Sequence, residues 1–135
     1  MIAIGELSRR SGVNIETIRY YEREGVLPTA HRAENGRRVY GEGDVARLAF
    51  VRHARDLGFE LPAVRVLLAL QEQPEASCDQ ARQLAGFQLE AVESRLRRLH
   101  SLRRELRRMV ESCAVGRVAE CRVIEALAEP LRVEA

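Results

Sequence analysis

Three cysteines are the residues of this sequence whose type and spacing point most directly to chemistry. Cys113 and Cys121 enclose a short loop near the end of the 135-residue chain, and Cys78 lies 35 residues before Cys113. An odd number of cysteines does not fit a purely disulfide role. Three thiolates that converge on one point would suit a soft metal ion.

Other roles for the thiols have to be weighed against metal binding. A zinc finger uses four ligands at C-x2–4-C spacing, and a dithiol switch uses C-x-x-C or an adjacent base; the sequence has neither pattern. A cysteine taken singly is more often a small buried apolar residue. The loop enclosed by Cys113 and Cys121 favours metal binding. The alternative is a thiol-based oxidation sensor, in which Cys78 and Cys113 of different chains form a disulfide.

A long helix is expected to position these thiols, because the segment from Cys78 to about residue 112 has no proline and a single glycine. Apolar residues recur in it at alternating spacings of three and four, which is a heptad seam interrupted by Arg103. Such a stripe needs a partner, and we expect a second copy of the chain to supply it. The predicted dimer interface comprises Leu89, Val92, Leu96, Leu99, Leu106 and Val110.

The cysteine spacing then predicts where a metal would bind. Because 35 residues are five heptads, Cys78 and Cys113 project from one stripe and lie roughly 50 Å apart on a continuous helix. They cannot share an ion within one chain. In an antiparallel homodimer, Cys78 of one chain would meet Cys113 and Cys121 of the other, which makes two equivalent three-thiol sites.

The N-terminal half shows a series of short helices and turns. One helix is expected to end at Gly12, and a second to begin after the N-cap residue Asn14 and end at Gly25. Asn35-Gly36 between short extended arms predicts a two-residue β-hairpin. Two further helices are expected after it. This order of elements describes a winged helix-turn-helix.

The second helix is the predicted recognition helix, with Ile15, Ile18 and Tyr21 facing inward. The net charge of +2 is too small to indicate nucleic-acid binding, but all 22 basic residues are arginine, whose planar fork suits phosphate and guanine. Any one arginine or tyrosine is more simply explained as surface or core. The joint pattern favours DNA binding by Asn14, Thr17, Arg19 and Tyr20 on the helix and by Arg37, Arg38 and Tyr40 on the wing.

Two stretches, "IGELSRRSGVNIETIRYYEREGVLP" and "RVYGEGDVARLAFVRHARDLGFEL", resemble the N-terminal half of the MerR family of transcription regulators. The resemblance implies a mainly α fold. It predicts a winged helix-turn-helix domain at 1–72, an antiparallel coiled-coil dimerisation helix at 73–112, and a metal-binding loop with a short helix at 113–135. It also implies DNA contacts by Arg19, Tyr20, Arg38 and Tyr40.

The resemblance bears on the metal as well. Metal-sensing members carry a C-x7-C or similar loop after the long helix, and sensors of divalent ions add a cysteine at the start of that helix, matched here by Cys78. Copper and gold sensors have serine there, so a Cu(I)-type sensor is an alternative. Three thiols without an obvious fourth donor favour Hg(II), followed by Pb(II), Cd(II) and Zn(II). Glu120 is a candidate weak fourth ligand.

By the same resemblance, the expected partners are double-stranded promoter DNA, a second copy of the chain and RNA polymerase. The metal-bound dimer would untwist the promoter and activate heavy-metal resistance genes. No enzyme is expected, because His31, His53 and His100 are scattered over unrelated elements. The sequence shows neither a signal peptide nor a transmembrane run, and we expect a cytoplasmic protein without membrane contact.

Overall fold

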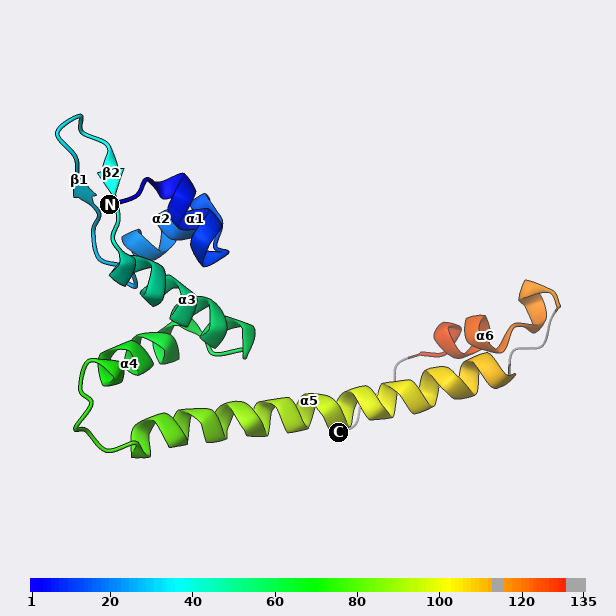
Figure 1. Cartoon of the computed structure of the whole chain (residues 1–135). Helices are drawn as coiled ribbons and strands as arrows, with labels where there is room; N and C mark the ends of the chain where they lie inside the picture. The colour runs from blue at the N-terminus through cyan, green and yellow to red at the C-terminus, as the bar shows by residue number, and fades with distance from the viewer. Residues whose placement is uncertain (113–115, 131–135) are drawn as a thin grey trace. The chain divides into compact units, whose positions relative to one another are not determined.

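The computed structural model describes residues 1–112 and 116–130. The chain divides into two compact units, the first from Met1 to Gln88 and the second from Leu89 onward. Figure 1 shows helices throughout and one small hairpin. The mainly α fold with a winged helix-turn-helix and a long helix is confirmed.

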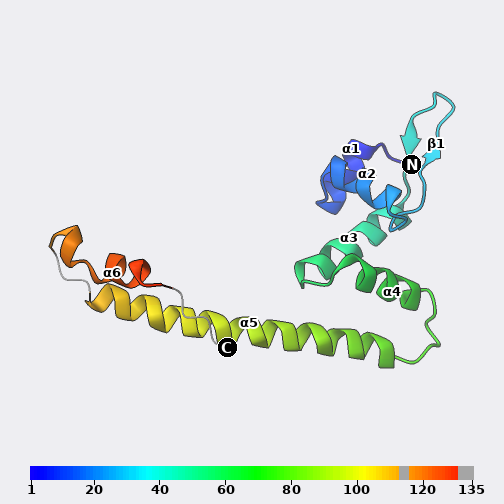
Figure 2. The same ribbon diagram turned by 180° about the vertical axis from the view of Figure 1, so that it is seen from behind.

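The first unit contains the elements of the expected winged helix-turn-helix and, in addition, the first turns of the long helix. In chain order these are α1 (Ile4–Ser11), α2 (Ile15–Arg23), β1 (His31–Arg32), β2 (Arg38–Val39), α3 (Glu42–Asp56), α4 (Leu61–Gln71) and the first turns of α5 (Asp79–Ser112). The second unit contains the rest of α5, the 3-10 helix η1 (Val118–Glu120) and α6 (Arg122–Ala128). In both Figure 1 and Figure 2, α6 lies alongside the C-terminal part of α5.

Local signals set the ends of the first two helices as predicted. Gly12 adopts a left-handed conformation, with φ of 74°, and its N–H donates to the main-chain oxygen of Ser8 at 2.9 Å. The side chain of Asn14 accepts a hydrogen bond of 2.8 Å from the N–H of Thr17. The two short helices are therefore joined by a tight turn whose residues cap both of them.

Helix α3 begins at Glu42, directly after the N-cap residue Gly41. The carboxylate of Asp44 accepts a hydrogen bond of 2.9 Å from the N–H of Gly41. Asp44 thus caps the helix from inside the first turn rather than from its N-terminal boundary, which is the second half of a capping box. Pro62 lies in the first turn of α4, where the missing N–H of proline leaves no helical hydrogen bond unmade.

The wing differs from the predicted two-residue hairpin. His31 pairs with Val39 and Arg32 with Arg38. Ala33 donates to the oxygen of Arg37 at 2.8 Å and accepts from Gly36 at 2.9 Å. Gly36 has a φ of 81°. The connection is therefore a three-residue loop with a left-handed glycine at its third position, another common hairpin type that an Asn-Gly pair can form.

The core of the first unit lies between α1, α2, α3 and α4, and α1 packs against both α2 and α3. Burial of each large apolar side chain contributes about 1.5–3 kcal/mol. Tyr21 is buried as predicted. The side chains with the least exposure are Leu7, Ile18, Val26, Leu27, Tyr40, Leu48, Val51, Val64 and Leu68.

Helix α5 is 34 residues long, which confirms the expected continuous helix. At 1.5 Å per residue it spans roughly 50 Å. It begins directly after Cys78, whose carbonyl oxygen accepts the N–H of Arg82 at 3.0 Å. Despite this length, neither α5 nor another helix in the described ranges has an apolar stretch long enough to cross a bilayer.

Candidate DNA-binding surface and thiol positions

Helix α2 presents one buried and one exposed face. Ile18 and Tyr21 anchor it in the core, while Arg19 and Tyr20 are exposed. The guanidinium carbon of Arg23 lies 5.9 Å from the centre of the Tyr20 ring, within reach of a cation–π interaction. Arg19 and Tyr20, both predicted DNA contacts, are therefore displayed at the surface on an anchored helix.

Asn14 and Thr17, the other two predicted contacts on this helix, have structural roles at its start. Asn14 is exposed but its side-chain oxygen is engaged by the N–H of Thr17, and Thr17 is half-buried. The side-chain amide nitrogen of Asn14 can donate to a further group while its oxygen caps the helix.

An open groove of about 670 Å³ runs between α2 and the wing, and arginine dominates its polar lining. Arg19 and Arg23 line it from α2, and Arg32, Arg37 and Arg38 line it from the hairpin. Five guanidinium groups around one concave surface suit the phosphate backbone of a nucleic acid.

Two of the five arginines, Arg23 and Arg32, were not among the residues predicted from the sequence. Arg23 could have been found, because it lies four residues after Arg19 and therefore on the same face of α2. Arg32 depends on the hairpin register, which pairs it with Arg38. Its guanidinium donates to the main-chain oxygen of Gly36 at 2.7 Å and so supports the wing loop.

The structure places Tyr40 in the core, and this corrects the prediction that it contacts DNA. Its side chain is 0% exposed, and its hydroxyl donates a hydrogen bond to the carboxylate of Glu22 on α2. Burial, followed by the hydrogen bond to Glu22, raises the pKa of Tyr40 to about 12. Tyr40 holds the base of the wing rather than reaching a groove.

Among the described residues, Arg38 has a carboxylate partner and Arg37 has none. Its guanidinium lies 3.1 Å from the Glu22 carboxylate, which is 8% exposed. Arg37 is exposed, and its N–H donates to the side-chain oxygen of Asn35 at 3.0 Å. The wing therefore offers one arginine on a turn and one arginine fixed to the recognition helix.

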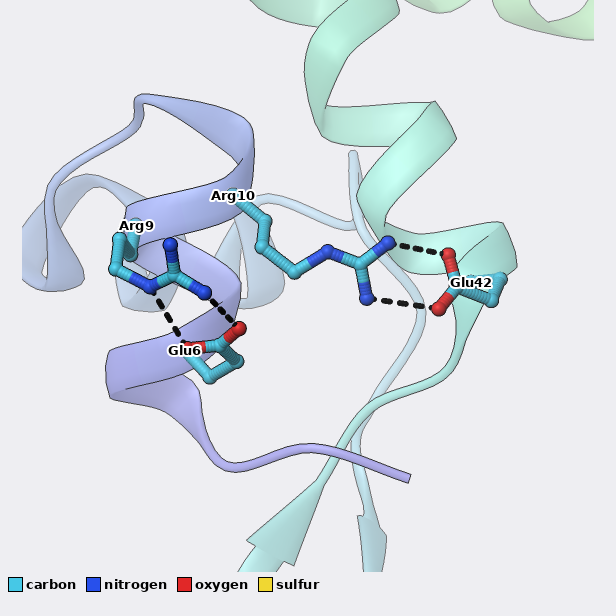
Figure 3. Close-up of polar contacts among 4 residues, drawn as sticks. All are labelled: Glu6, Arg9, Arg10 and Glu42. Carbon is cyan, nitrogen blue, oxygen red and sulfur yellow. Dashed lines mark hydrogen bonds and ion pairs between the residues drawn. The ribbon is translucent and has the colours of Figure 1, made fainter.

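Figure 3 shows two ion pairs at α1, one of which connects the helix-turn-helix to the start of α3. Arg10 donates two hydrogen bonds, of 2.7 and 2.6 Å, to the two carboxylate oxygens of Glu42. This hydrogen bonding holds the pKa of the Glu42 carboxyl below its ordinary value. Arg9 makes a similar pair with Glu6 within α1. Because Glu42 follows the wing directly, the Arg10 pair restrains the point where the wing ends.

The three cysteines fall in different parts of the chain. Cys78 is exposed at the start of α5, in the first unit. Cys121 is half-buried in the second unit, where its carbonyl oxygen accepts the N–H of Glu125 at 3.0 Å and so begins α6. Cys113 lies outside the described residues. Within residues 1–112 and 116–130, no three histidine, cysteine or acidic side chains gather around one point. Glu120 is exposed in η1.

The predicted dimer seam is an exposed apolar stripe on α5. Val92 has the lowest exposure of the predicted residues, at 38%, and Val110 the highest, at 70%. Leu102, which the heptad reading omitted, is also a large apolar residue with 43% exposure. An apolar groove of about 530 Å³ is formed near the end of the stripe by Leu99, Leu102, Arg103, Leu106, Arg107 and Val110.

Comparison with known proteins agrees with this arrangement. The model of the MerR HTH family regulatory proteins matches residues 2–71, and the MerR DNA-binding model matches residues 45–109. The first match covers the helix-turn-helix, the wing, α3 and α4. The second extends from α3 through most of α5.

Relatives match along nearly the whole chain. The transcriptional regulator ZntR of Escherichia coli K12 is 38% identical over 130 residues, covering 94% of this chain and 92% of that protein. The mercuric resistance operon regulatory protein of Bacillus cereus is 37% identical over 125 residues, covering 92% and 95%. The structure of the regulator PbrR691 from Ralstonia metallidurans CH34 in complex with lead(II) is 34% identical, with a TM-score of 0.80 and coverage of 95% and 100%. The chain belongs to the MerR family of helix-turn-helix transcription regulators, which are DNA-binding proteins and not enzymes.

Proposed function

We propose that this chain is a metal-sensing transcription regulator that binds promoter DNA as a homodimer and activates heavy-metal resistance genes. The observation that carries the DNA-binding part is the groove between α2 and the wing, lined by five arginines. Arg19 and Tyr20 would contact base edges and Arg37 and Arg38 would contact phosphates, since base contacts specify a sequence and phosphate contacts position the protein.

Substitutions in the groove test this assignment on a duplex that the wild-type protein enriches from a random library. Arg19→Ala should reduce the binding free energy on that duplex by about 1–3 kcal/mol if Arg19 makes a bidentate hydrogen bond to a base. Arg38→Ala should weaken binding to all duplexes alike. It should also reduce the salt slope, which is the steepness with which the logarithm of the binding constant falls with the logarithm of the salt concentration, by about 1. Unchanged binding in both variants would refute the assignment of the groove.

The dimer is supported by the exposed stripe on α5. A surface helix with large apolar residues along one side over several heptads is stabilised when that side packs against another helix. A second copy supplies a matching stripe, and the arginine at position 103 is tolerated at the edge of such a seam because its stem is apolar. A two-fold dimer would present two α2 helices to two half-sites of a promoter.

The metal part of the proposal rests on the donor set and on the relatives. Thiolates are the ligands that soft ions prefer. Exposed Cys78 of one chain would join Cys113 and Cys121 of the other, with Glu120 as a candidate weak fourth ligand. One relative is named for a mercuric resistance operon and one solved structure contains lead(II). Hg(II) is our first choice, then Pb(II), Cd(II) and Zn(II).

In such a site the two chains would be cross-linked through thiolates, and binding would release the thiol protons. The change at the dimer ends would alter the spacing of the two recognition helices. This change in spacing would untwist the promoter and so present it to RNA polymerase. Proteins that deform DNA in this way act on the shape of the DNA rather than on individual bases.

The test is a titration of the reduced protein with Hg(II), Pb(II), Cd(II), Zn(II) and Cu(I), following thiolate-to-metal absorption and stoichiometry. We expect two divalent ions per dimer and tightest binding of Hg(II). Preference for Cu(I) would select a copper-type sensor instead. A reversible disulfide between chains, formed without any metal and changing DNA binding, would select the thiol-based oxidation sensor.

A further inference from the structure

Glu22 is an acidic residue with a largely buried side chain, in a groove whose other charged lining residues are arginines. It lines the groove between α2 and the wing, yet its side chain is 8% exposed. It lies three residues after Arg19, on the face of α2 that borders the groove. A buried carboxylate is stable only when its oxygens are hydrogen-bonded or paired with a cation.

Both partners of this carboxylate come from the wing. One oxygen accepts a hydrogen bond from the Tyr40 hydroxyl, and the other lies 3.1 Å from the guanidinium of Arg38. Charge-assisted hydrogen bonds of this kind are stronger and more directional than neutral ones. Glu22 thus joins the recognition helix to Arg38 in β2 and to Tyr40, which follows that strand.

Tyr40, directly after β2, is held by main-chain bonds to the start of the chain. Ile2 and Tyr40 exchange two hydrogen bonds of 2.8 Å each. The buried ring of Tyr40 therefore has its main chain fixed to Ile2 and its hydroxyl fixed to Glu22. Arg38, two residues before Tyr40, is held in place by its own hydrogen bond to the same Glu22 carboxylate.

From this geometry we propose that Glu22 is a positioning residue that favours specific over non-specific DNA binding. The inference rests on the proposed DNA-binding function. Glu22 fixes the wing relative to α2, and sequence readout needs that fixed relation because base contacts tolerate little misplacement. At the same time its negative charge lowers the positive potential of the groove, which governs sequence-independent attraction.

The two effects of Glu22 have opposite consequences when the charge is removed. Non-specific binding depends on the number of phosphates neutralised. It therefore strengthens when the Arg38 guanidinium is no longer paired with the Glu22 carboxylate and can pair with a phosphate. Specific binding depends on the wing being held in a fixed position relative to the base-contacting residues of α2, so it weakens. A residue that merely stabilised the fold would change both kinds of binding in the same direction.

The test uses the full-length protein and two duplexes, one enriched by the wild-type protein from a random library and one of the same composition with a scrambled sequence. For Glu22→Gln, we expect affinity for the enriched duplex to fall about tenfold and affinity for the scrambled duplex to stay level or rise. The salt slope on the scrambled duplex should steepen by up to about 1. Glu75→Gln, which removes the same charge from an exposed position, should leave the ratio of the two affinities unchanged.

A second variant separates placement from charge and guards against misfolding of the first. Glu22→Asp keeps the charge but withdraws the carboxylate by one methylene, so the affinity ratio should fall with an unchanged salt slope. In an Arg38→Ala background, Glu22→Gln should change the salt dependence of binding less, because no guanidinium is released, as expected for coupled residues.

The experiment separates failure of the proposed DNA-binding function from failure of the proposed role of Glu22. If the wild-type protein enriches no duplex, the DNA-binding function fails and this inference fails with it. If a duplex is enriched but the affinity ratio is the same in the wild type and in both Glu22 variants, only the role of Glu22 is overturned. Parallel weakening on both duplexes overturns it as well.

Discussion

The side-chain amide of Gln88 donates a hydrogen bond of 2.9 Å to the main-chain oxygen of Leu57, where α3 ends. A Cβ added at the neighbouring Gly58 would lie 2.2 Å from the same amide nitrogen, so the two segments approach closely. Gly58 also has a φ of 92°, which a side chain would strain. The end of α3 and the first turns of α5 are thus joined within the first unit.

Loss of this bond should loosen the beginning of α5. We expect Gln88→Ala to reduce amide hydrogen-exchange protection in residues 79–88 by up to about tenfold, because one hydrogen bond contributes about 1 kcal/mol. Exchange followed by mass spectrometry measures this. Gln83→Ala on the same helix is the matched control and should leave protection there unchanged. Equal protection in both variants would contradict the role of Gln88.

Asn14 should show a stability effect that is separable from DNA contact. Asn14→Ala removes the acceptor for the Thr17 N–H and should lower the free energy of unfolding by about 1 kcal/mol. Asn14→Ser retains a capping oxygen and should lie within a few tenths of a kcal/mol of the wild type. Urea denaturation measures both. If Asn14→Ser preserves stability but weakens DNA binding, Asn14 contacts DNA as well.

The buried hydroxyl of Tyr40 predicts a loss of stability at high pH. Its pKa is raised from 10.0 to about 12 in the folded state, so the folded protein holds this proton more tightly than the unfolded chain. The resulting stability is complete below pH 10 and is lost as pH rises through about 12, amounting to roughly 3 kcal/mol.

Tyr40→Phe tests this relation, because it lacks the titrating group. Between pH 10 and 12 the wild-type denaturation midpoint in urea should fall more steeply than that of the variant. At pH 7 the variant should be less stable, because the Glu22 carboxylate loses a buried partner. Identical pH slopes for the two proteins would count against a native-state hydrogen bond between Tyr40 and Glu22.

The proposed dimer predicts that charge on the α5 stripe produces monomers. Leu99→Glu with Leu106→Glu places two like charges in the seam and should abolish dimerisation and binding to two half-sites. Ser94→Glu with Ser101→Glu adds the same charges, also seven residues apart, on the opposite side of the heptad pattern. Sedimentation should find monomers for the first protein and dimers for the second. A dimer in both would exclude this stripe as the interface.

A metal site shared between chains predicts complementation between two defective proteins. One carries Cys78→Ser, and the other carries Cys113→Ser with Cys121→Ser. After subunit exchange, the mixed dimer has one end with all three thiols and one end with none. Tight binding of Hg(II) should reappear at one ion per mixed dimer, whereas each parent protein keeps only incomplete sites. Confirmed exchange without recovered binding would show that the site does not bridge chains.

The sequence by itself determined the elements whose signals act over a few residues. Gly12 and Asn14 mark the turn between α1 and α2 because a left-handed glycine and a capping side chain bond to groups within four positions. The periodicity of leucine and valine predicted α5 as one helix, since the helical repeat is itself local. The family resemblance is visible for the same reason.

Only the tertiary structure decided the roles of Tyr40 and Glu22. Tyr40 follows two arginines in a hairpin and has the pattern of a surface contact, but its burial depends on Ile2 and Glu22, which are distant in sequence. The groove likewise needed the hairpin register to bring Arg32 to Arg19 and Arg23. Local patterns cannot specify which distant groups satisfy a buried polar atom, because that pairing is settled by the packing of the folded chain.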